Sequence, residues 1–309
     1  MRLFPLLALV SLICWGQVYT LPCPTQNVLS VVGAGDYSSD NGVASNSLVS
    51  VFGPNIATTI VTTPDESPAV LPVQLGGVSA TITDSSKNTL PVPLIAVTPG
   101  QVNAVLPNGL QVGVGYVNLT TYNGTQICAG VQINQVAPSL FSADNTGSWL
   151  AAAQVVISHA DGTQTIMDSV AQYSSTPAYN GSGWSNWIPI PINLGTSTDT
   201  AVLELFGTGI RGESSYTAAG YGGLPFVSIC NQPQYCDQTE PVLTVLYAGP
   251  QGGGLPSSFY GLDQVNVILP HSLAGSGINY VDLGTPSPLS ASDGTWQVLT
   301  ANMVEIDIQ

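Results

Sequence analysis

A seven-residue sequence occurs twice in this chain. Residues 101–107 read QVNAVLP and residues 264–270 read QVNVILP, so five positions are identical and the copies lie 264 − 101 = 163 residues apart. An apolar segment that ends in Phe-Gly precedes each copy, SLVSVFG at residues 47–53 and AVLELFG at residues 201–207. A Gly-containing turn and another apolar segment follow each copy. Matched features in the same order predict two copies of one structural unit, duplicated and diverged.

Both units have the sequence pattern of β-structure. Short runs rich in β-branched residues are bounded by Gly, Pro, Asn and Asp, as in GVSATIT, VGVGYVNLTTY, AQVVISH and PVLTVLYAG. The Asp-Gly pair in HADGTQT is typical of a hairpin turn. No capped amphipathic helix is evident. We therefore predict two all-β sandwich domains in tandem, over residues 17–138 and 139–309.

The first 16 residues have the pattern of a secretory signal peptide. Arg2 precedes an apolar run over residues 3–13, and small and polar residues follow. The run is shorter than the ~20 apolar residues of a membrane span. A lipoprotein leader would need a small residue before Cys14, where Ile13 stands. We expect export, a mature chain that begins at Gln17, a secreted or cell-surface location, and no membrane span.

Charge is scarce along the chain. Only 7% of the residues are charged, the formal net charge is −15, and Lys87 and Arg211 are the only basic residues after the leader. Such a chain cannot neutralise phosphates, which excludes nucleic acid and anionic membrane surfaces as partners. Hydrophobic burial, backbone hydrogen bonds and disulfides must stabilise the fold in place of ion-pair networks.

Four cysteines remain after the leader, an even number that predicts two disulfides in an exported chain. Cys230 and Cys236 flank the turn-like segment CNQPQYC, so we predict that they pair and leave Cys23 with Cys128. The alternative is that some of these thiols are free and buried. No CxxC sequence is present, and we predict neither a zinc site nor any other cofactor.

The order of these segments resembles a known family. The sequences SLVSVFGPNIA, VTPGQVNAVLP, LELFGTGI and YGLDQVNVILP are similar to the Solibacter-type C-terminal domain of uncharacterised secreted bacterial proteins, from about Asn27 to Gln309. Each half also resembles an IPT/TIG-type domain, which implies two immunoglobulin-like sandwiches and no established catalytic role. In that family the module usually ends a much longer protein, whereas here it follows the leader directly.

We predict that the protein is not an enzyme. His159 and His271 are expected in turns, and no GxSxG, HExxH or P-loop motif is present. The carboxylates are scattered beside Gly, Ser and Asn, which indicates roles in turns, and no EF-hand loop occurs.

An aromatic Gly/Ser-rich segment over residues 173–190 contains Tyr173, Tyr179, Trp184 and Trp187. Exposed aromatic side chains on a β-sandwich stack on sugar rings or anchor protein interfaces. The alternative is that the tryptophans cover the gap between the two domains.

Three glycosylation sequons occur, at Asn118, Asn123 and Asn180. The Asn, Ser and Thr content alone predicts about three such matches by chance. Modification of these residues is therefore a weak prediction of the sequence.

Two functions are compatible with these features, and a secreted hydrolase with carboxylates paired in space is a more distant third. A soluble monomer normally has about 25–35% charged residues on its surface, so the scarcity of charge favours a subunit of an extracellular assembly such as a filament, sheath or surface layer. The alternative is a carbohydrate-binding or adhesive module that binds polysaccharide through residues 173–190.

For self-association into a homopolymer we predict a junction at Val28, Leu29, Val31 and Val32, or at an edge strand formed by the closing VEIDIQ. The alternative for residues 28–32 is pairing within the first domain.

Overall fold

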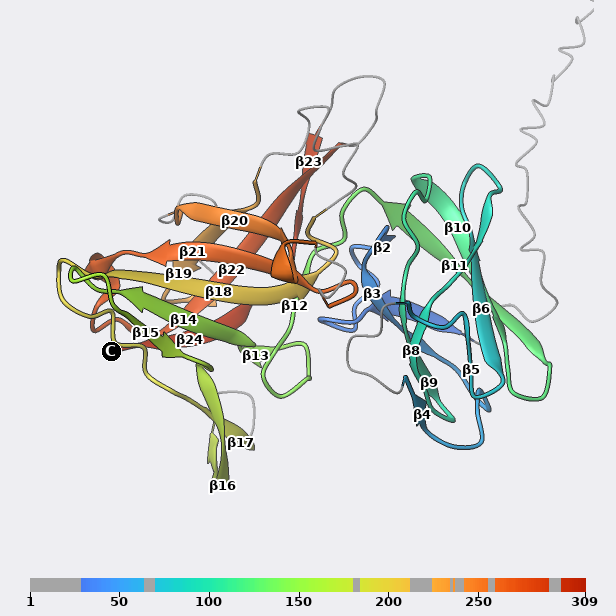
Figure 1. The fold of residues 1–309 in the computed structure, drawn as a ribbon, viewed down its shortest axis with the longest axis horizontal. Helices are drawn as coiled ribbons and strands as arrows, with labels where there is room; N and C mark the ends of the chain where they lie inside the picture. Colours follow the sequence, from blue (N-terminus) through green and yellow to red (C-terminus); the bar gives the residue numbers. More distant parts are fainter. Residues whose placement is uncertain are drawn as a thin grey trace, which may run out of the picture.

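The computed structural model describes residues 29–63, 70–179, 184–211, 224–233, 236, 242–254, 259–288 and 296–309. The described chain is almost entirely β-structure, with short 3-10 helices at η2 (Gln251–Gly254) and η3 (His271–Leu273). Its strands form two bodies, each built from two sheets (Figure 1). Among the described residues, no helix has the length and apolar character needed to cross a membrane. The predicted all-β sandwich fold is confirmed, and the predicted leader lies outside the described residues.

The first sandwich packs a five-stranded sheet against a six-stranded sheet. In strand order, the first sheet contains β1 (Ser30–Gly33), β3 (Leu48–Phe52), β9 (Gln101–Val105), β8 (Leu94–Val97) and β4 (Val61–Thr62). The second contains β2 (Val43–Ala44), β11 (Gln126–Asn134), β10 (Gly113–Thr120), β6 (Val78–Thr83) and β5 (Gln74–Leu75), with β7 (Thr89–Pro91) beside β6. Alternate side chains of both sheets, such as Val49, Ile82 and Leu119, form one buried core.

The second sandwich repeats this plan over residues 139–309. Its first sheet contains β15 (Gln164–Met167), β14 (Ala153–Ser158), β18 (Thr200–Thr208), β21 (Asp263–Leu269) and β20 (Val245–Pro250), with β12 (Ser139–Leu140) beside β18. Its second sheet contains β13 (Trp149–Leu150), β24 (Val304–Ile308), β22 (Gly277–Pro288) and β19 (Phe226–Cys230), with β23 (Trp296–Thr300) beside β22. Its core includes Leu203, Val267 and Ile306.

The two sandwiches share one topology. The order β3-β9-β8 corresponds to β18-β21-β20, and β2-β11-β10-β6 corresponds to β13-β24-β22-β19. Among the described strands, a parallel pair in each body also corresponds, because β2 runs parallel to β11 and β13 runs parallel to β24. The duplication predicted from the sequence is therefore visible in strand order. The main difference is an insertion in the second sandwich, β14 to β17, between β13 and β18.

The repeated QVN sequence builds the same strand in both bodies. Val102 and Val265 point into the two cores, where neither is exposed. The flanking Gln and Asn lie on the opposite face, because side chains alternate along a strand. Gln101 Nε2 donates to Asn103 Oδ1 at 2.7 Å, and Gln264 Nε2 donates to Asn266 Oδ1 at 2.8 Å. Both copies of QVN thus serve the same purpose. The Val fills the core, and the Gln and Asn on either side of it form a hydrogen-bonded amide pair on the opposite face.

The structure corrects one of the two predicted junctions. The closing VEIDIQ segment forms β24, which pairs with β22 on one side and with β13 on the other. Ile192 adds a further backbone pair, since Gln309 N donates to the carbonyl oxygen of Ile192 at 2.9 Å. The prediction of an edge strand is wrong, because β24 is hydrogen-bonded along both sides.

The N-terminal apolar segment is part of the first sandwich. β1 pairs with β3, and Leu29, Val31 and Val32 are all buried. This is the alternative arrangement considered for residues 28–32, and Val28 itself lies outside the described residues. The apolar side chains described in this segment therefore pack within their own domain, and β1 is the last strand at one edge of its sheet.

Candidate functional site: interdomain hollows and a projecting hairpin

Directed hydrogen bonds join the two sandwiches. The amide of Leu48 in the first sandwich donates to Thr208 Oγ1 in the second at 2.7 Å, and that hydroxyl donates to the carbonyl oxygen of Gly261 at 2.7 Å. Asn41 Nδ2 donates to the carbonyl oxygens of Pro138 at 3.0 Å and Thr300 at 2.7 Å. The relative position of the sandwiches is therefore fixed by specific contacts as well as by the short connection between β11 and β12.

Glycines allow the two backbones to approach closely at this interface. A Cβ atom added to Gly147 of the second sandwich would lie 2.7 Å from Asp36 Cα of the first. Gly147 also has φ +78°, a conformation that side chains disfavour. A residue larger than glycine at position 147 would therefore collide with the backbone of the first sandwich.

Two adjacent hollows open beside the interface, and both are lined by residues of both sandwiches. They share Leu48 and Ile95 of the first sandwich and Phe141 of the second. The polar hollow, of about 210 Å³, is completed by Ala34, Gly35, Tyr37, Val49, Ser50, Asn103 and Asn145. The apolar hollow, of about 230 Å³, is completed by Thr63, Leu71, Phe259, Tyr260 and Leu262. None of these lining residues is charged, so either hollow suits a neutral ligand.

The polar hollow combines backbone strain with a hydrogen-bonded floor. Tyr37 and Asn145 have φ values of +56° and +57°, which are uncommon for residues other than glycine. At the floor, Asn103 Oδ1 accepts from Ser50 Oγ at 3.3 Å and from Gln101 Nε2. The first QVN sequence therefore faces the interdomain region as well as building its own strand.

The aromatic segment forms a hairpin that projects from the second sandwich (Figure 1). Its strands, β16 (Ala171–Tyr179) and β17 (Trp184–Pro189), form a separate two-stranded sheet. Tyr173 is 67% exposed and Trp184 is 75% exposed. Tyr173 meets Trp187 edge to face, with ring centroids 6.2 Å apart. A two-stranded hairpin is only marginally stable in water by itself, so this element is suited to further contacts.

The predicted aromatic residues do not form one flat surface. Trp184 and Trp187 are three residues apart on β17, so they point to opposite faces of the hairpin. Tyr173 shares the face of Trp187, its direct cross-strand partner. The hairpin lines neither hollow, which is contrary to the interpretation that the tryptophans cover the gap between the domains. The side chain of Tyr179 lies outside the described residues.

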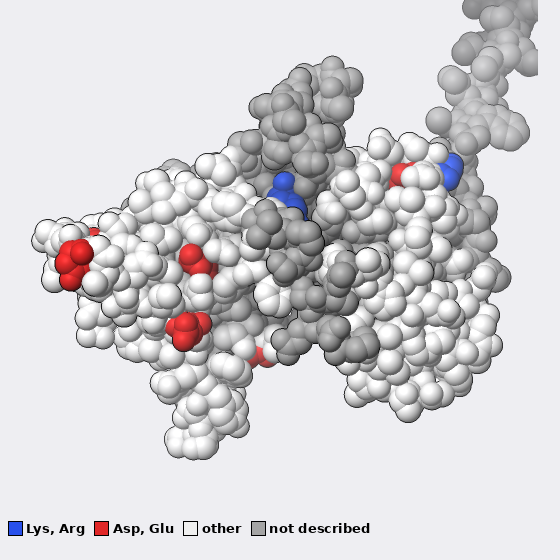
Figure 2. All heavy atoms as spheres, viewed as in Figure 1, with Lys and Arg blue, Asp and Glu red and all other residues white. Residues whose placement is uncertain are grey.

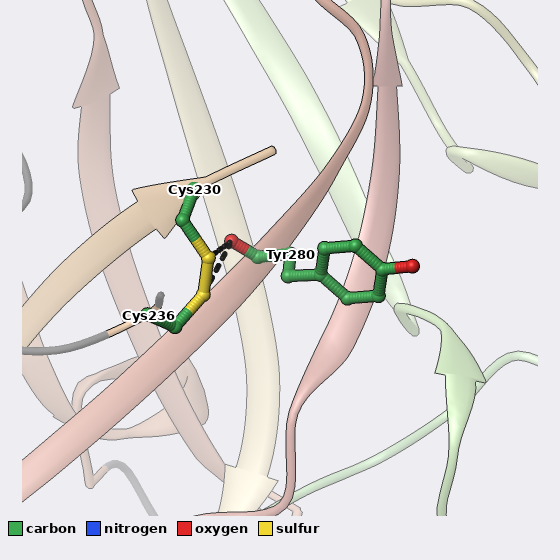
Figure 3. Close-up of a disulfide and its surroundings, with 3 residues drawn as sticks. All are labelled: Cys230, Cys236 and Tyr280. Atoms are coloured by element: carbon green, nitrogen blue, oxygen red, sulfur yellow. Dashed lines mark hydrogen bonds between the residues drawn. A yellow bond between two sulfur atoms is a disulfide. The ribbon is translucent and has the colours of Figure 1, made fainter. Parts of the chain in front are cut away.

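One predicted disulfide is observed and the other is described in part. Cys230, the last residue of β19, is bonded to Cys236, with Cα atoms 5.4 Å apart. Both sulfur atoms lie close to the carbonyl oxygen of Tyr280, at 3.9 and 4.0 Å (Figure 3). Cys128 is buried in β11 and is disulfide-bonded. Its predicted partner Cys23 lies outside the described residues.

The sequons differ in local structure. Asn123 lies in an exposed turn, where its Oδ1 accepts from Thr121 Oγ1 at 2.6 Å and from the amide of Thr125 at 3.1 Å. Its amide nitrogen, the atom that carries a glycan, takes no part in these bonds. Asn118 lies within β10, and its Oδ1 is buried without a hydrogen bond. Asn180 lies outside the described residues. Of the two described sequons, Asn123 has the more suitable geometry for modification.

Both histidines contact Asp199, an arrangement that no motif of the sequence indicated. His159 Nδ1 lies 3.3 Å from Asp199 Oδ2, and His159 Nε2 lies 2.8 Å from Thr165 Oγ1. His271 Nε2 lies 3.0 Å from the carbonyl oxygen of Asp199. Asp199, His159 and Thr165 are connected in the order carboxylate, imidazole and hydroxyl, which is the order of a catalytic triad. None of these residues lines either hollow. Its contacts join the segments that follow β14 and β21 to the segment that precedes β18, at one end of the second sandwich.

Burial raises the pKa of four carboxyl groups, those of Asp36, Asp263, Asp282 and Glu305. A raised pKa means that the folded state binds protons more tightly than the unfolded state, so stability falls as the pH rises through these values. We therefore expect the melting temperature to rise as the pH is lowered from 8 to about 4.5. About 1 kcal/mol corresponds to roughly 2–4 °C in a domain of this size.

Circular dichroism melting across this pH range provides the measurement. Asp282→Asn should reduce the slope, because burial is the only cause of its raised pKa. Asp161 and Asp199 have lowered pKa values through hydrogen bonds with Thr163 and Thr196, and their contribution is lost only at lower pH. A melting temperature that increased from pH 4.5 to pH 8 would contradict this prediction.

Comparison with known proteins finds no matching family model and no matching curated protein. Among solved structures, the chain is similar to the tetra-tandem repeat in the extending region of a large adhesion protein. The match has 11% sequence identity and a TM-score of 0.21, and it covers 91% of this chain and 74% of that chain. At these values the likeness does not bear on function.

Proposed function

We propose that this protein is an exported structural protein that forms a subunit of an extracellular assembly, and that the β16–β17 hairpin joins neighbouring copies. The observation that supports this proposal is the hairpin itself. Tyr173 and Trp184 are both largely exposed on it, and the hairpin extends beyond the body of the sandwich in Figure 1. Large aromatic side chains on an element of marginal stability gain most when a partner covers them.

The charge distribution agrees with self-association. Acidic and basic side chains are scattered over an otherwise uncharged surface in the view of Figure 2. The hairpin sequence, residues 171–189, contains no charged residue. Two copies that each carry a net charge of −15 repel one another least where uncharged surfaces meet. The hairpin is such a surface.

The second candidate function is adhesion to a polysaccharide. The exposure of Trp184 favours it, because an exposed indole ring stacks on a sugar ring. Tyr173 and Trp187 do not extend the stacking surface of Trp184, because they lie on the opposite face of the hairpin and their rings meet at 85°. A sugar stacked on Trp184 would therefore contact neither Tyr173 nor Trp187, whereas a protein groove would cover both faces.

Removal of the hairpin tests the proposed function. Ala171 and Pro189 are cross-strand partners at its base, so residues 172–188 can be replaced by an Asn-Gly turn. We expect the wild-type chain to form ordered polymers in electron microscopy and the shortened chain to stay monomeric with a similar melting temperature. Its control is Ile166→Ser, which removes an exposed side chain of β15 outside the hairpin and should leave assembly unchanged.

The two candidate functions give different results. A wild-type chain that remains monodisperse at all concentrations, binds insoluble polysaccharide and loses this binding on Trp184→Ala would support adhesion and overturn assembly. Polymers that persist after removal of the hairpin would place the junction elsewhere, with the backbone edge of β1 as the next segment to test.

A further inference from the structure

We infer that the β16–β17 hairpin of one copy inserts an exposed aromatic side chain into the apolar hollow of the next copy. This inference rests on the proposed function and names both sides of the contact. The partner is a second copy of this chain.

The apolar hollow has the size and chemistry of a receptor for an aromatic ring. A cavity of about 150 Å³ accommodates a benzene ring, and this hollow measures about 230 Å³. Leu48, Ile95, Phe141 and Leu262 provide apolar contacts from both sandwiches. Phe259 is 46% exposed as part of this lining. Burial of this surface against a second copy would remove an exposed aromatic side chain from water.

The hairpin has the complementary properties. Trp184 and Tyr173 are the aromatic side chains of the hairpin that are most exposed among those described. The hairpin sequence contains no charged residue, and none of the described residues that line the apolar hollow is charged. In a chain with a net charge of −15, this pair of surfaces brings two copies together without placing carboxylates against each other. An aromatic side chain buried in a pocket is also the usual energetic centre of a protein interface.

The positions of the two surfaces determine the kind of assembly. The hairpin projects from the second sandwich (Figure 1), whereas residues of both sandwiches line the hollow. The same chain therefore carries a projection and a receptor at different places. Such a contact is heterologous, so each added copy leaves one projection and one receptor free, and the assembly grows as an open filament unless the rotation closes a ring.

A mixing experiment tests the contact directly. The first variant lacks the hairpin, with residues 172–188 replaced by Asn-Gly. The second carries Ile95→Glu, which places a carboxylate in the lining of the hollow at a side chain that is only partly buried. Each variant alone should be monomeric in analytical ultracentrifugation. An equimolar mixture should form 1:1 complexes and no polymer, because the hairpin of the second variant can occupy the intact hollow of the first.

Phe259→Ser provides a milder change in case Ile95→Glu prevents folding, because Phe259 is partly exposed already. We expect it to increase the concentration required for polymerisation by about tenfold, the effect of a loss near 1.4 kcal/mol. Its melting temperature should match that of the wild type.

The outcomes separate this inference from the proposed function. If wild-type polymers form but a folded Ile95→Glu chain also polymerises, the hollow is not the receptor, and the proposed function survives. A mixture that contains only monomers likewise overturns the inference. If the wild type is monomeric and binds polysaccharide, both the inference and the proposed assembly are overturned.

Discussion

Replacement of Arg211 by alanine is expected to destabilise the second sandwich by about 3–5 kcal/mol, the usual effect of removing one partner from a buried ion pair. Asp263 is fully buried at the start of β21. Its Oδ2 accepts from the amides of Ile210 at 2.8 Å and Arg211 at 3.2 Å, and its Oδ1 accepts from Arg211 Nε. Arg211 Nη2 also donates to the carbonyl oxygen of Leu262 at 2.6 Å. Without the guanidinium, the carboxylate would be buried without a counter-charge.

The matched control is Lys87→Gln, which removes the other Lys or Arg residue beyond residue 16 from an exposed turn and should leave stability unchanged. Urea denaturation at pH 8 and pH 5 provides the measurement. Burial raises the pKa of Asp263 and Arg211 opposes this, so the variant should protonate Asp263 more readily, and its defect should shrink at pH 5. A loss below 1 kcal/mol at pH 8 would show that water solvates the carboxylate.

This ion pair is also a point at which the duplicated sandwiches have diverged. In the first sandwich, Gly100 stands directly before QVN where Asp263 stands in the second. The amide of Ile56, which corresponds to Ile210, donates to the carbonyl oxygen of Pro99 at 3.0 Å. The equivalent backbone amide thus donates to a main-chain carbonyl oxygen in the first sandwich and to a buried carboxylate in the second.

Gly147→Ala is expected to separate the two sandwiches. The left-handed backbone by itself costs an alanine roughly 1–2 kcal/mol. The new Cβ would also lie 2.7, 2.8 and 2.9 Å from the Cα, O and C atoms of Asp36, and backbone cannot move aside as a flexible side chain can. We expect a loss of more than about 2 kcal/mol, together with cleavage of the connection at residues 135–138 in limited proteolysis.

Gly275→Ala is the matched control for this change. Gly275 has φ +77°, nearly equal to the +78° of Gly147, but a Cβ there would meet nothing within 4 Å. The difference between the two variants in calorimetry therefore reports the interface alone, and small-angle scattering should show expansion only for Gly147→Ala. Equal effects of the two substitutions would mean that the sandwiches do not depend on this contact. Because both hollows are lined from both sandwiches, polymerisation should fail with Gly147→Ala as well.

The sequence by itself determined the features that depend on short-range patterns. The shared order of motifs around QVNAVLP and QVNVILP indicated the duplication, because each motif is a short local pattern that recurs in both units. The disulfide between Cys230 and Cys236 was predictable for the same reason, since the two cysteines are six positions apart and the intervening segment suits a turn.

Only the tertiary structure decided which edges are covered and which distant loops meet. VEIDIQ reads equally well as an edge or an inner strand, and pairing with residues more than 150 positions earlier made it an inner strand. His159, Asp199 and His271 are far apart in the sequence, and the hollow joins Ile95 to Phe259, because the packing of whole sandwiches brings their loops together. A local pattern fixes the face toward which a side chain points. Which surface this face contacts depends on how segments that are distant in the sequence pack together, and no local pattern contains that information.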